Sequence, residues 1–450
     1  MSQDTSCSSK RAEALILGGG MTGLAAGWAS GFPVYEAEEA PGGICSSYYV
    51  GPGSQERLHQ PPEGGEAYRF EVGGGHWIFG GDPAVLRFIR SLAPVKTYPR
   101  TSSVFFPDQG LYVPYPLQNH LGYLGKEVCT TALLEMLTAP KSQFRTMEEW
   151  LVQSFGRTLT DAFFGPFHEL YTAGLWKRIA PQDPYKSPVD APLVVRGASE
   201  ATPPVGYNAS YIYPQEGLNA LAQGMAERCN VHYRKRVTRV DARSKEVLFE
   251  DGTAVGYESL LSTLPLNKMI ETTGVNLAEE PDPYTSVLVL NIGAVRGAKC
   301  PSDHWIYLPR SQARFHRVGF YSNVDVSFLP SSSRKSNNRV SIYVERAYPG
   351  GQKPAPNEVT VYSEAAVREL QGWEFIKDVE VLDPTWIDVA YTWSWPESKW
   401  RPAALKALDE HDIHMVGRYA RWVFQGIADS IREGFFVRAS AKAHADYLVQ

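Results

Sequence analysis

The chain has 450 residues, of which 43% are hydrophobic and 21% are charged, and its formal net charge is −5. A chain of this size predicts two or three lobes rather than one core. The slightly acidic balance excludes a basic surface for nucleic acid, and no apolar run is long enough to span a bilayer. The polar first residues show no secretory segment, so we expect a short disordered N-terminal tail and a cytoplasmic location.

A glycine-rich loop near the N-terminus is the strongest motif of the sequence. It follows a predicted buried strand at residues 14–17 and has the spacing G-x-G-x-x-G, with Gly18, Gly20 and Gly23. The first glycine permits the tight turn that leaves the strand, the second lets a pyrophosphate approach the backbone, and the third lets the next helix pack on the sheet. A helix is predicted from about Met21, with its N-terminus facing the phosphates.

An acidic residue and a second pair of glycines complete this motif. A short strand predicted at residues 32–35 ends on Glu36, where a carboxylate would accept hydrogen bonds from a ribose. The order of strand, glycine turn, helix, strand and acid predicts dinucleotide binding, and a glycine-rich structural turn is the alternative. Gly42 and Gly43 follow the acid and would bring the backbone close to the dinucleotide, which favours FAD over NAD.

A third glycine run precedes a histidine. Residues 48–67 predict a loop or hairpin insert, and residues 68–85 contain Gly73 to Gly75 followed by His76. Consecutive glycines would bring the backbone against a flat group. His76 is therefore a candidate functional residue, with a core or loop histidine as an equally weighted alternative.

The middle of the chain predicts a hairpin and then helices. The hairpin is expected around residues 107–110, and the segment VPYPLQ after it would present Tyr115 and Gln118 as an exposed ring and amide. Helices are predicted to follow, and the aromatic-rich stretch at residues 161–175 is expected to face a cleft. Residues 176–209 predict irregular structure.

The C-terminal half predicts more strands. A turn and a helix at residues 212–228 precede a β-meander with a turn at Asp251-Gly252, which would rejoin the dinucleotide domain. Strands of a second sheet are predicted at residues 284–295, 303–308, 314–322 and 339–346. From residue 413 the chain predicts a strand, a glycine turn and a helix that fold back on the cofactor.

The cysteine pattern favours a reducing environment. The five cysteines are scattered and form no C-x-x-C pair: Cys7, Cys45, Cys129, Cys229 and Cys300. This pattern argues against a disulfide framework or a zinc site, and we predict no metal. Cys45 lies close to the predicted dinucleotide loop, where a small buried side chain is favoured over a catalytic thiol because the sequence shows no histidine neighbour.

Several segments together resemble the UDP-galactopyranose mutase family, in particular its eukaryotic branch, within the FAD flavoproteins related to amine oxidases and protoporphyrinogen oxidase. The segments are PGGICSS, GGHWIF, RTSSV with VPYPLQNHL, YPQEGLNAL, STLPL, HWIYLP, RFHRVGFYSN and the closing GR-x₃-W with ADSIREG. They occur in order from residue 14 to about residue 440. The resemblance implies an α/β fold in which a Rossmann-like FAD-binding domain carries an inserted helical domain and a second, antiparallel β-sheet substrate domain.

The domain boundaries expected from this resemblance are discontinuous. The FAD-binding domain would comprise residues 12–100, 205–270 and 405–445. The helical insert that lines the substrate cleft would comprise residues 118–200, and the β-sheet substrate domain residues 101–117 and 271–404.

The resemblance also implies an activity. The family binds FAD, and the reduced flavin N5 attacks the anomeric carbon of a UDP-sugar, so that the sugar ring opens and recloses at another size without net oxidation. We therefore expect an FAD-dependent isomerase with a nucleotide-sugar substrate, and we consider a homo-oligomer. The alternatives are an amine-oxidase-like FAD oxidoreductase acting on a sugar- or amine-containing metabolite, and a non-catalytic flavoprotein scaffold.

Together with the glycine motifs, the resemblance implies three groups of site residues. The catalytic group is His76, Tyr307 and Arg317, of which the last two would hold the diphosphate. The cofactor group is Gly18, Gly20, Gly23, Glu36, Gly42, Gly43, Gly75, Arg100, Val237, Gly417, Arg418 and Asp429. The substrate group is Tyr115 and Gln118, which match uracil-recognition positions, with Trp395 and Tyr419.

Two positions depart from the family pattern. Trp422 is followed by Val423 where the family has a basic residue, and Ser394-Trp395-Pro396 replaces its Gly-Tyr-Pro. Arg421 is a candidate substitute for the missing charge. Candidates for another diphosphate contact, each also interpretable as a solvated charge, are Lys177, Arg178 and Arg196. Because loss of one bidentate contact would cost about 2–4 kcal/mol of binding, the leaving group or the whole substrate would differ.

Overall fold

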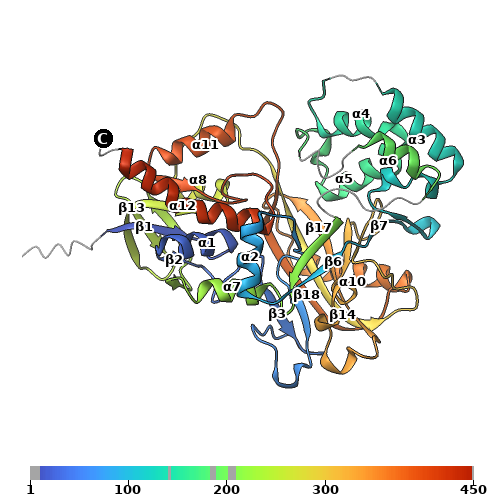
Figure 1. Cartoon of the computed structure of the whole chain (residues 1–450), viewed down its shortest axis with the longest axis horizontal. Helices are drawn as coiled ribbons and strands as arrows, with labels where there is room; N and C mark the ends of the chain where they lie inside the picture. Colours follow the sequence, from blue (N-terminus) through green and yellow to red (C-terminus); the bar gives the residue numbers. More distant parts are fainter. Residues whose placement is uncertain (1–10, 140–142, 183–188, 201–208, 448–450) are drawn as a thin grey trace, which may run out of the picture.

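The computed structural model describes residues 11–139, 143–182, 189–200 and 209–447. Figure 1 shows an α/β part that holds the N-terminal strand, a helical part coloured teal and green, and a β part coloured mainly orange. This arrangement confirms the predicted α/β fold class, whereas the residue boundaries of the three domains stay a prediction. The predicted N-terminal tail and Cys7 lie outside the described residues.

The first sheet has seven strands and carries the glycine motif. Its order is β10-β2-β1-β13-β12-β11, with β19 paired to β13. The strands are β1 Ala12–Leu17, β2 Val34–Tyr35, β10 Val231–His232, β11 Val237–Asp241, β12 Glu246–Phe249, β13 Ala254–Ser262 and β19 Ile413–Met415. Since β1 pairs in parallel with both β2 and β13, the loop after Leu17 lies at the carboxyl edge of the sheet, where α/β folds bind ligands.

Helices pack around this sheet. They are α1 Met21–Ser30, α2 Pro83–Leu92, α7 Leu218–Ala226, α8 Leu266–Thr273, α11 Trp400–Asp409 and α12 Ile427–Tyr447. A Cβ atom added at Gly434 would lie 2.4 Å from the carbonyl oxygen of Thr22, so α12 packs directly on the backbone of α1 (Figure 1). The predicted final strand, glycine turn and helix are thus confirmed, and the first half of α12 packs beside the first motif.

The second sheet also has seven strands, in the order β18-β14-β17-β16-β15-β7-β8. They are β7 Ser102–Phe106, β8 Leu111–Pro114, β14 Tyr284–Arg296, β15 Trp305–Tyr307, β16 Arg317–Phe320, β17 Arg339–Pro349 and β18 Ile376–Thr392. Two helices flank it, the short α9 Tyr321–Val324 and the long α10 Pro356–Gly372. β18 was not predicted from the sequence, because Pro384 and several acidic residues interrupt its pattern of alternation. A strand at the edge of a sheet tolerates both.

Two small sheets connect these parts. β3 Ser47–Val50 pairs with β4 Tyr68–Glu71, and β9 Ser210–Pro214 lies between β5 Ile78–Phe79 and β6 Val95–Pro99. The predicted loop or hairpin at residues 48–67 is confirmed as a hairpin, in which β3 and the antiparallel β4 flank a long connecting loop. Single-turn 3₁₀ helices are η1 Glu63–Gly65, η2 Pro107–Gln109, η3 Leu117–Asn119, η4 Leu121–Leu124, η6 Leu175–Lys177, η9 Val326–Phe328 and η10 Ser331–Ser333.

The helical part contains α3 Lys126–Thr138, α4 Met147–Leu159, the π-helix η5 Thr160–Phe164, α5 Gly165–Tyr171 and α6 Ala191–Gly197. Pro166 has no N–H to donate to the preceding turn, and the Gly165 N–H bonds five residues back to Thr160, which gives the π-turn its spacing. The predicted irregular structure at residues 176–209 is wrong for α6, and residues 183–188 and 201–208 of that stretch lie outside the described residues. None of the helices that the structure describes is long and apolar enough to cross a membrane.

Glu71 is a fully buried carboxyl group at the end of β4. Its side chain is 0% exposed and accepts hydrogen bonds from the hydroxyl groups of Ser47, at 2.7 Å, and Tyr213. Burial raises the pKa of Glu71 to about 7, although both hydroxyl groups oppose that shift. Between pH 4.5 and 7, Glu71 is therefore protonated in the native state and ionised in the unfolded chain. The contribution of this group to the free energy of unfolding falls as pH rises through that window.

Replacing Glu71 by Gln is expected to remove most of this pH dependence, because the amide keeps the oxygen that Ser47 and Tyr213 contact but carries no charge. Between pH 5 and pH 8 the free energy of unfolding of the wild type should fall by about 2 kcal/mol relative to Glu71→Gln. Urea unfolding at both pH values measures the difference, with the exposed Glu250→Gln as control. If the free energy of unfolding falls equally in the wild type and in Glu71→Gln between the two pH values, Glu71 is not the source of the pH dependence.

Candidate functional site

A single cavity of about 780 Å³ joins the glycine motif to the helical part. Its walls at the glycine motif, here called the glycine end, are Gly18, Gly20, Glu36, Gly42 and Gly43. Its walls from the helical part and the end of β18, here called the aromatic wall, are Trp150, Phe163, Phe164, Phe167, Tyr171 and Trp393. The predicted cleft face of residues 161–175 is confirmed, since four members of the aromatic wall come from that stretch.

The three glycines of the first motif have different surroundings. Gly18 has φ +96°, a conformation that favours glycine, at the turn out of β1. A Cβ atom at Gly23 would lie 1.9 Å from the carbonyl oxygen of Gly18, so only glycine lets α1 pack this close to the turn. A Cβ atom at Gly20 would meet none of the described atoms within 4 Å, because it would project into open space beside the N-terminus of α1. These surroundings fit the three predicted uses of the glycines.

The acid and the second glycine pair lie against the first loop. Glu36 is 7% exposed and accepts hydrogen bonds from the N–H groups of Gly19, at 2.6 Å, and Glu38, at 2.8 Å. Burial raises the pKa of Glu36, and these N–H groups oppose that shift. The Gly42 N–H donates to the Gly19 carbonyl at 2.8 Å, and Gly42 forms a parallel bridge with Gly20. Both glycine-rich segments thus form one end of the cavity.

This end of the cavity fits a dinucleotide. The first turn of α1 carries no acidic residue and no side-chain cap from the described residues, so its N–H groups are available to phosphate oxygens. The space beside Gly20 admits a pyrophosphate, and Glu36 supplies the carboxylate that a ribose hydroxyl needs. Gly417, Arg418, Tyr419 and Asp429, from the turn after β19 and the start of α12, complete the wall.

His76 lies in the middle of the cavity at the end of the third glycine run. A Cβ atom added at Gly75 would lie 2.1 Å from the hydroxyl oxygen of Tyr343, and one added at Gly74 would lie 2.8 Å from Glu345 Oε1. Only glycine at these two positions lets the loop approach β17. Nδ1 of His76 lies 3.2 Å from the Gly74 carbonyl oxygen, which can only accept, so Nδ1 carries the proton. Burial lowers the pKa of His76 to about 4, and nearby Arg418 adds to that shift, so the ring is neutral with Nε2 as an acceptor.

Arg317 is held by a carboxylate, Glu345, that was not predicted from the sequence. Its Nε and Nη2 donate to Glu345 at 2.9 and 2.5 Å, and Nε2 of His316 lies 3.4 Å from the same carboxylate. Burial opposes ionisation of Glu345, but Arg317 and His316 outweigh it and lower the pKa to about 2. The Arg317–Glu345 pair is therefore neutral as a unit, and the guanidinium fork already has an anionic partner.

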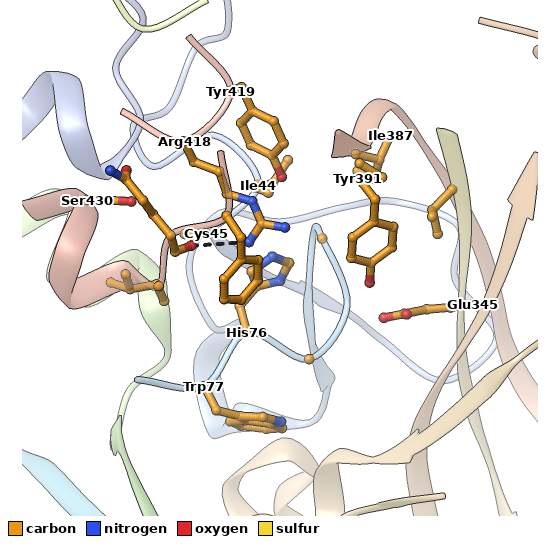
Figure 2. Close-up of a pocket in the computed structure, with 18 of the residues that line it drawn as sticks. Ile44, Cys45, His76, Trp77, Glu345, Ile387, Tyr391, Arg418, Tyr419 and Ser430 are labelled. Carbon is orange, nitrogen blue, oxygen red and sulfur yellow. Dashed lines mark hydrogen bonds between the residues drawn. The ribbon is translucent and has the colours of Figure 1, made fainter. Parts of the chain in front are cut away.

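Arg418 has a different environment. Its Nη1 donates to the Gln425 carbonyl at 3.2 Å, and its guanidinium carbon lies 4.6 Å from the ring centroid of Phe424. Burial opposes its charge, while the hydroxyl groups of Tyr419 and Tyr391 raise its pKa, and no carboxylate of the described residues pairs with it. Figure 2 shows Arg418 beside Cys45 and His76, with Tyr391 and Glu345 further along the same cavity. Arg418 can therefore hold an anionic group.

The other predicted site residues are divided between the cavity and the surrounding protein. Tyr115 and Tyr307 both line the cavity, with ring centroids 4.8 Å apart. Arg100 lies behind them and donates to the Tyr115 carbonyl at 3.0 Å. Gln118 is 0% exposed inside η3, so the prediction of an exposed amide is wrong: the turn after Tyr115 directs this side chain inward. Val237 begins β11 and does not line the cavity.

Neither departure from the family pattern supplies a charge to the cavity. Trp395 donates its indole N–H to the Pro281 carbonyl at 3.1 Å, and Trp393, two residues earlier, lines the cavity instead. Arg421 is half exposed and lies 3.3 Å from Glu433, so it cannot replace the missing basic residue. Lys177, Arg178 and Arg196 also lie outside the cavity wall.

Several cavity residues had no signal in the sequence. Glu345, His168 and Tyr391 line the cavity, yet each stands alone in a strand or aromatic helix without a spacing motif. His316 also lines the cavity, in the segment RFHRVGFYSN, where only Arg317 was predicted as a site residue. Only the register of β16 against β17, which pairs Arg317 with Glu345, brings the charged pair together. The four described cysteines are free, and no cluster of three metal-ligating side chains occurs in the described ranges.

Residues 203–291 match the family model of flavin containing amine oxidoreductases. A crystal structure of reduced UDP-galactopyranose mutase is 21% identical, with a TM-score of 0.78 and 94% of each chain covered. A protein from Exiguobacterium sp. 255-15, assigned as a protoporphyrinogen oxidase, is 12% identical, with a TM-score of 0.67 and coverage of 97% of this chain and 99% of that one. Putrescine oxidase bound to putrescine is 14% identical, with a TM-score of 0.55 and coverage of 96% and 99%. The chain therefore has the mixed α/β fold of these FAD-dependent oxidoreductases and of the mutase.

Proposed function

We propose that the protein is an FAD-dependent oxidoreductase that acts on an uncharged or cationic substrate bound against the aromatic wall. The observation that carries the proposal is the pairing of Arg317 with Glu345, which neutralises one of the two guanidinium groups that line the cavity. The other, Arg418, would hold the cofactor. The match of residues 203–291 to the flavin containing amine oxidoreductases supports it. So does the fold shared with putrescine oxidase, a protein that binds a diamine.

The residues of the glycine end would hold the cofactor. The N-terminus of α1 and Arg418 would face the pyrophosphate, Glu36 would accept from a ribose hydroxyl, and His76 would lie beside the flavin. FAD, when bound, supplies an acceptor for two electrons from the substrate. The chain would contribute a preorganised chamber in which His76 is neutral and presents Nε2 as an acceptor.

The charges of the cavity wall support a substrate without phosphates. The carboxylates Glu36, Glu345 and Asp429 line the cavity together with two guanidinium groups, Arg317 and Arg418, which leaves one net negative charge. The lining histidines do not offset it, because burial lowers the pKa of His76 and His168 to about 4 and also lowers that of His316. FAD would add the charge of its own pyrophosphate. A second diphosphate would then bind against repulsion in a site of low dielectric.

A nucleotide-sugar mutase is the second candidate. Tyr115 and Tyr307 lie in contact on the cavity wall, as expected for recognition of a base and a diphosphate, and the TM-score of 0.78 to reduced UDP-galactopyranose mutase favours it. That reaction is a ring contraction of the sugar with no net transfer of electrons. The two candidates therefore differ in redox stoichiometry.

The discriminating experiment begins with the protein loaded with FAD under anaerobic conditions. Stoichiometric bleaching of the flavin by at least one member of a panel of primary amines, amino sugars and alcohols is the expected result. In parallel, calorimetry with dithionite-reduced protein should show no UDP binding tighter than about 1 mM. Arg317→Ala and the outward-facing Arg421→Ala form the matched pair of variants for the UDP arm. UDP binding that Arg317→Ala abolishes, with no flavin bleaching by the panel, would favour the mutase and overturn our proposal.

A further inference from the structure

His168 faces the cavity from α5, one turn after the π-helix. Its Nδ1 lies 2.6 Å from the Phe164 carbonyl oxygen, and its ring meets those of Phe167 and Tyr171 edge to face, with centroids 5.3 and 6.1 Å apart. The side chain is half buried and lines the cavity beside the aromatic wall. The backbone and two aromatic rings therefore fix the imidazole in place.

The hydrogen bond of Nδ1 defines the tautomer of His168. A carbonyl oxygen only accepts, so Nδ1 carries the proton and Nε2 presents a lone pair. Burial lowers the pKa of His168 to about 4, so the ring stays neutral at physiological pH. Among the described residues, Nδ1 is the only ring nitrogen of His168 that makes a hydrogen bond, and Nε2 has no partner. The cavity thus contains a fixed acceptor that is open to a hydrogen-bond donor on a ligand.

We propose that His168 is a specificity-determining residue, whose Nε2 accepts a hydrogen bond from an O–H or N–H group on a ring-bearing substrate that lies against the aromatic wall. This inference deepens the proposed function by naming the substrate class: a planar, uncharged or cationic ring with a hydrogen-bond donor. The aromatic wall supplies stacking and edge contacts to the ring, and His168 distinguishes rings that carry a donor from those that do not.

The expected discrimination follows from the cost of an unmatched polar group. A ring without a donor would cover Nε2 without satisfying it, and such a loss corresponds to at least a tenfold weaker affinity. A ring that presents an acceptor to Nε2 would be rejected for the same reason.

Phenol, anisole and toluene test the inference, because they share a ring and differ in the donor. The purified FAD-loaded protein is titrated with each, and binding is followed by the flavin difference spectrum and by calorimetry. Phenol should bind at least tenfold tighter than anisole or toluene to the wild type. In His168→Phe the three affinities should converge, with toluene unchanged. His414→Phe, at a histidine paired with Asp409 on the surface, is the matched control and should keep the wild-type ratios.

A second measurement covers the case in which His168→Phe does not fold. Nitrogen NMR of histidine-labelled wild type should show an unprotonated Nε2 for His168 that shifts on addition of phenol and not of toluene, with His168→Asn used to assign the signal. Equal affinities of the three probes in the wild type, or an unchanged ratio in His168→Phe, would overturn the inference. If amines and alcohols fail to bleach the flavin but phenol selectivity depends on His168, the oxidoreductase proposal fails while this one stands.

Discussion

Gly20→Ala is expected to leave the fold of the FAD-free protein intact and to weaken FAD binding about 100-fold. The backbone at Gly20 has φ −73° and ψ 179°, which any residue adopts, and an added Cβ would meet none of the described atoms within 4 Å. The methyl group would instead occupy the space through which a pyrophosphate approaches the first N–H groups of α1. Loss of one or two charge-assisted hydrogen bonds, about 3 kcal/mol, corresponds to this change in affinity.

Gly23→Ala is the matched variant with the opposite profile. Its methyl group would lie 1.9 Å from the Gly18 carbonyl oxygen, so we expect a loss of about 3 kcal/mol in the stability of the FAD-free protein. Urea unfolding of the FAD-free proteins measures the stability, and quenching of flavin fluorescence measures the affinity. Gly20→Ala should shift the unfolding free energy by less than about 1 kcal/mol. Wild-type FAD affinity in Gly20→Ala would rule out the glycine end as the pyrophosphate site.

The glycine motifs could be predicted from the sequence because their chemistry belongs to the backbone. Gly18, Gly23 and Gly75 each lie where a side chain would collide with a neighbouring segment. Each of these positions therefore requires glycine, and glycines at a fixed spacing can be recognised in the sequence. The α/β class, the meander and the returning C-terminal helix follow from the same local patterns. Short-range patterns in the sequence therefore predicted most strands of the first sheet and the residues at one end of the cavity.

The aromatic stretch of the opposite wall was predicted, but its charged pair and the directions of its single side chains could not be, because they depend on long-range register and on local backbone geometry. Glu345 meets Arg317 only through the antiparallel pairing of β16 with β17, and a shift of one residue would send its side chain to the other face. The backbone conformation after the end of β18 directs Trp393 into the cavity and Trp395 away from it. His168 is oriented by a π-turn that depends on the missing N–H of Pro166. None of these arrangements has a fixed spacing in the sequence.

Glu345→Gln is expected to have two large effects with one cause. Removing the carboxylate leaves the guanidinium of Arg317 largely buried without its anionic partner, so the protein should lose about 3 kcal/mol of stability at pH 7. In the wild type, the same carboxylate has a folded pKa of about 2 against an ordinary value of 4.5. Its contribution to stability is therefore complete above pH 4.5 and is lost as pH falls towards 2. In Glu345→Gln this acid-linked loss should be absent.

The second effect of Glu345→Gln concerns ligand choice. With the carboxylate gone, Arg317 becomes a free cation in the cavity wall, and we expect UDP to bind the variant at least tenfold tighter than the wild type. Calorimetry at pH 7 with the reduced, FAD-loaded proteins measures this gain. Glu345→Gln combined with Arg317→Gln should abolish it, and Glu250→Gln, which removes an exposed partner of Arg236 outside the cavity, should not produce it. If the wild type already binds UDP as tightly as Glu345→Gln, the phosphates can displace Glu345 from Arg317. The charge argument for an oxidoreductase then fails, and the mutase becomes the better candidate.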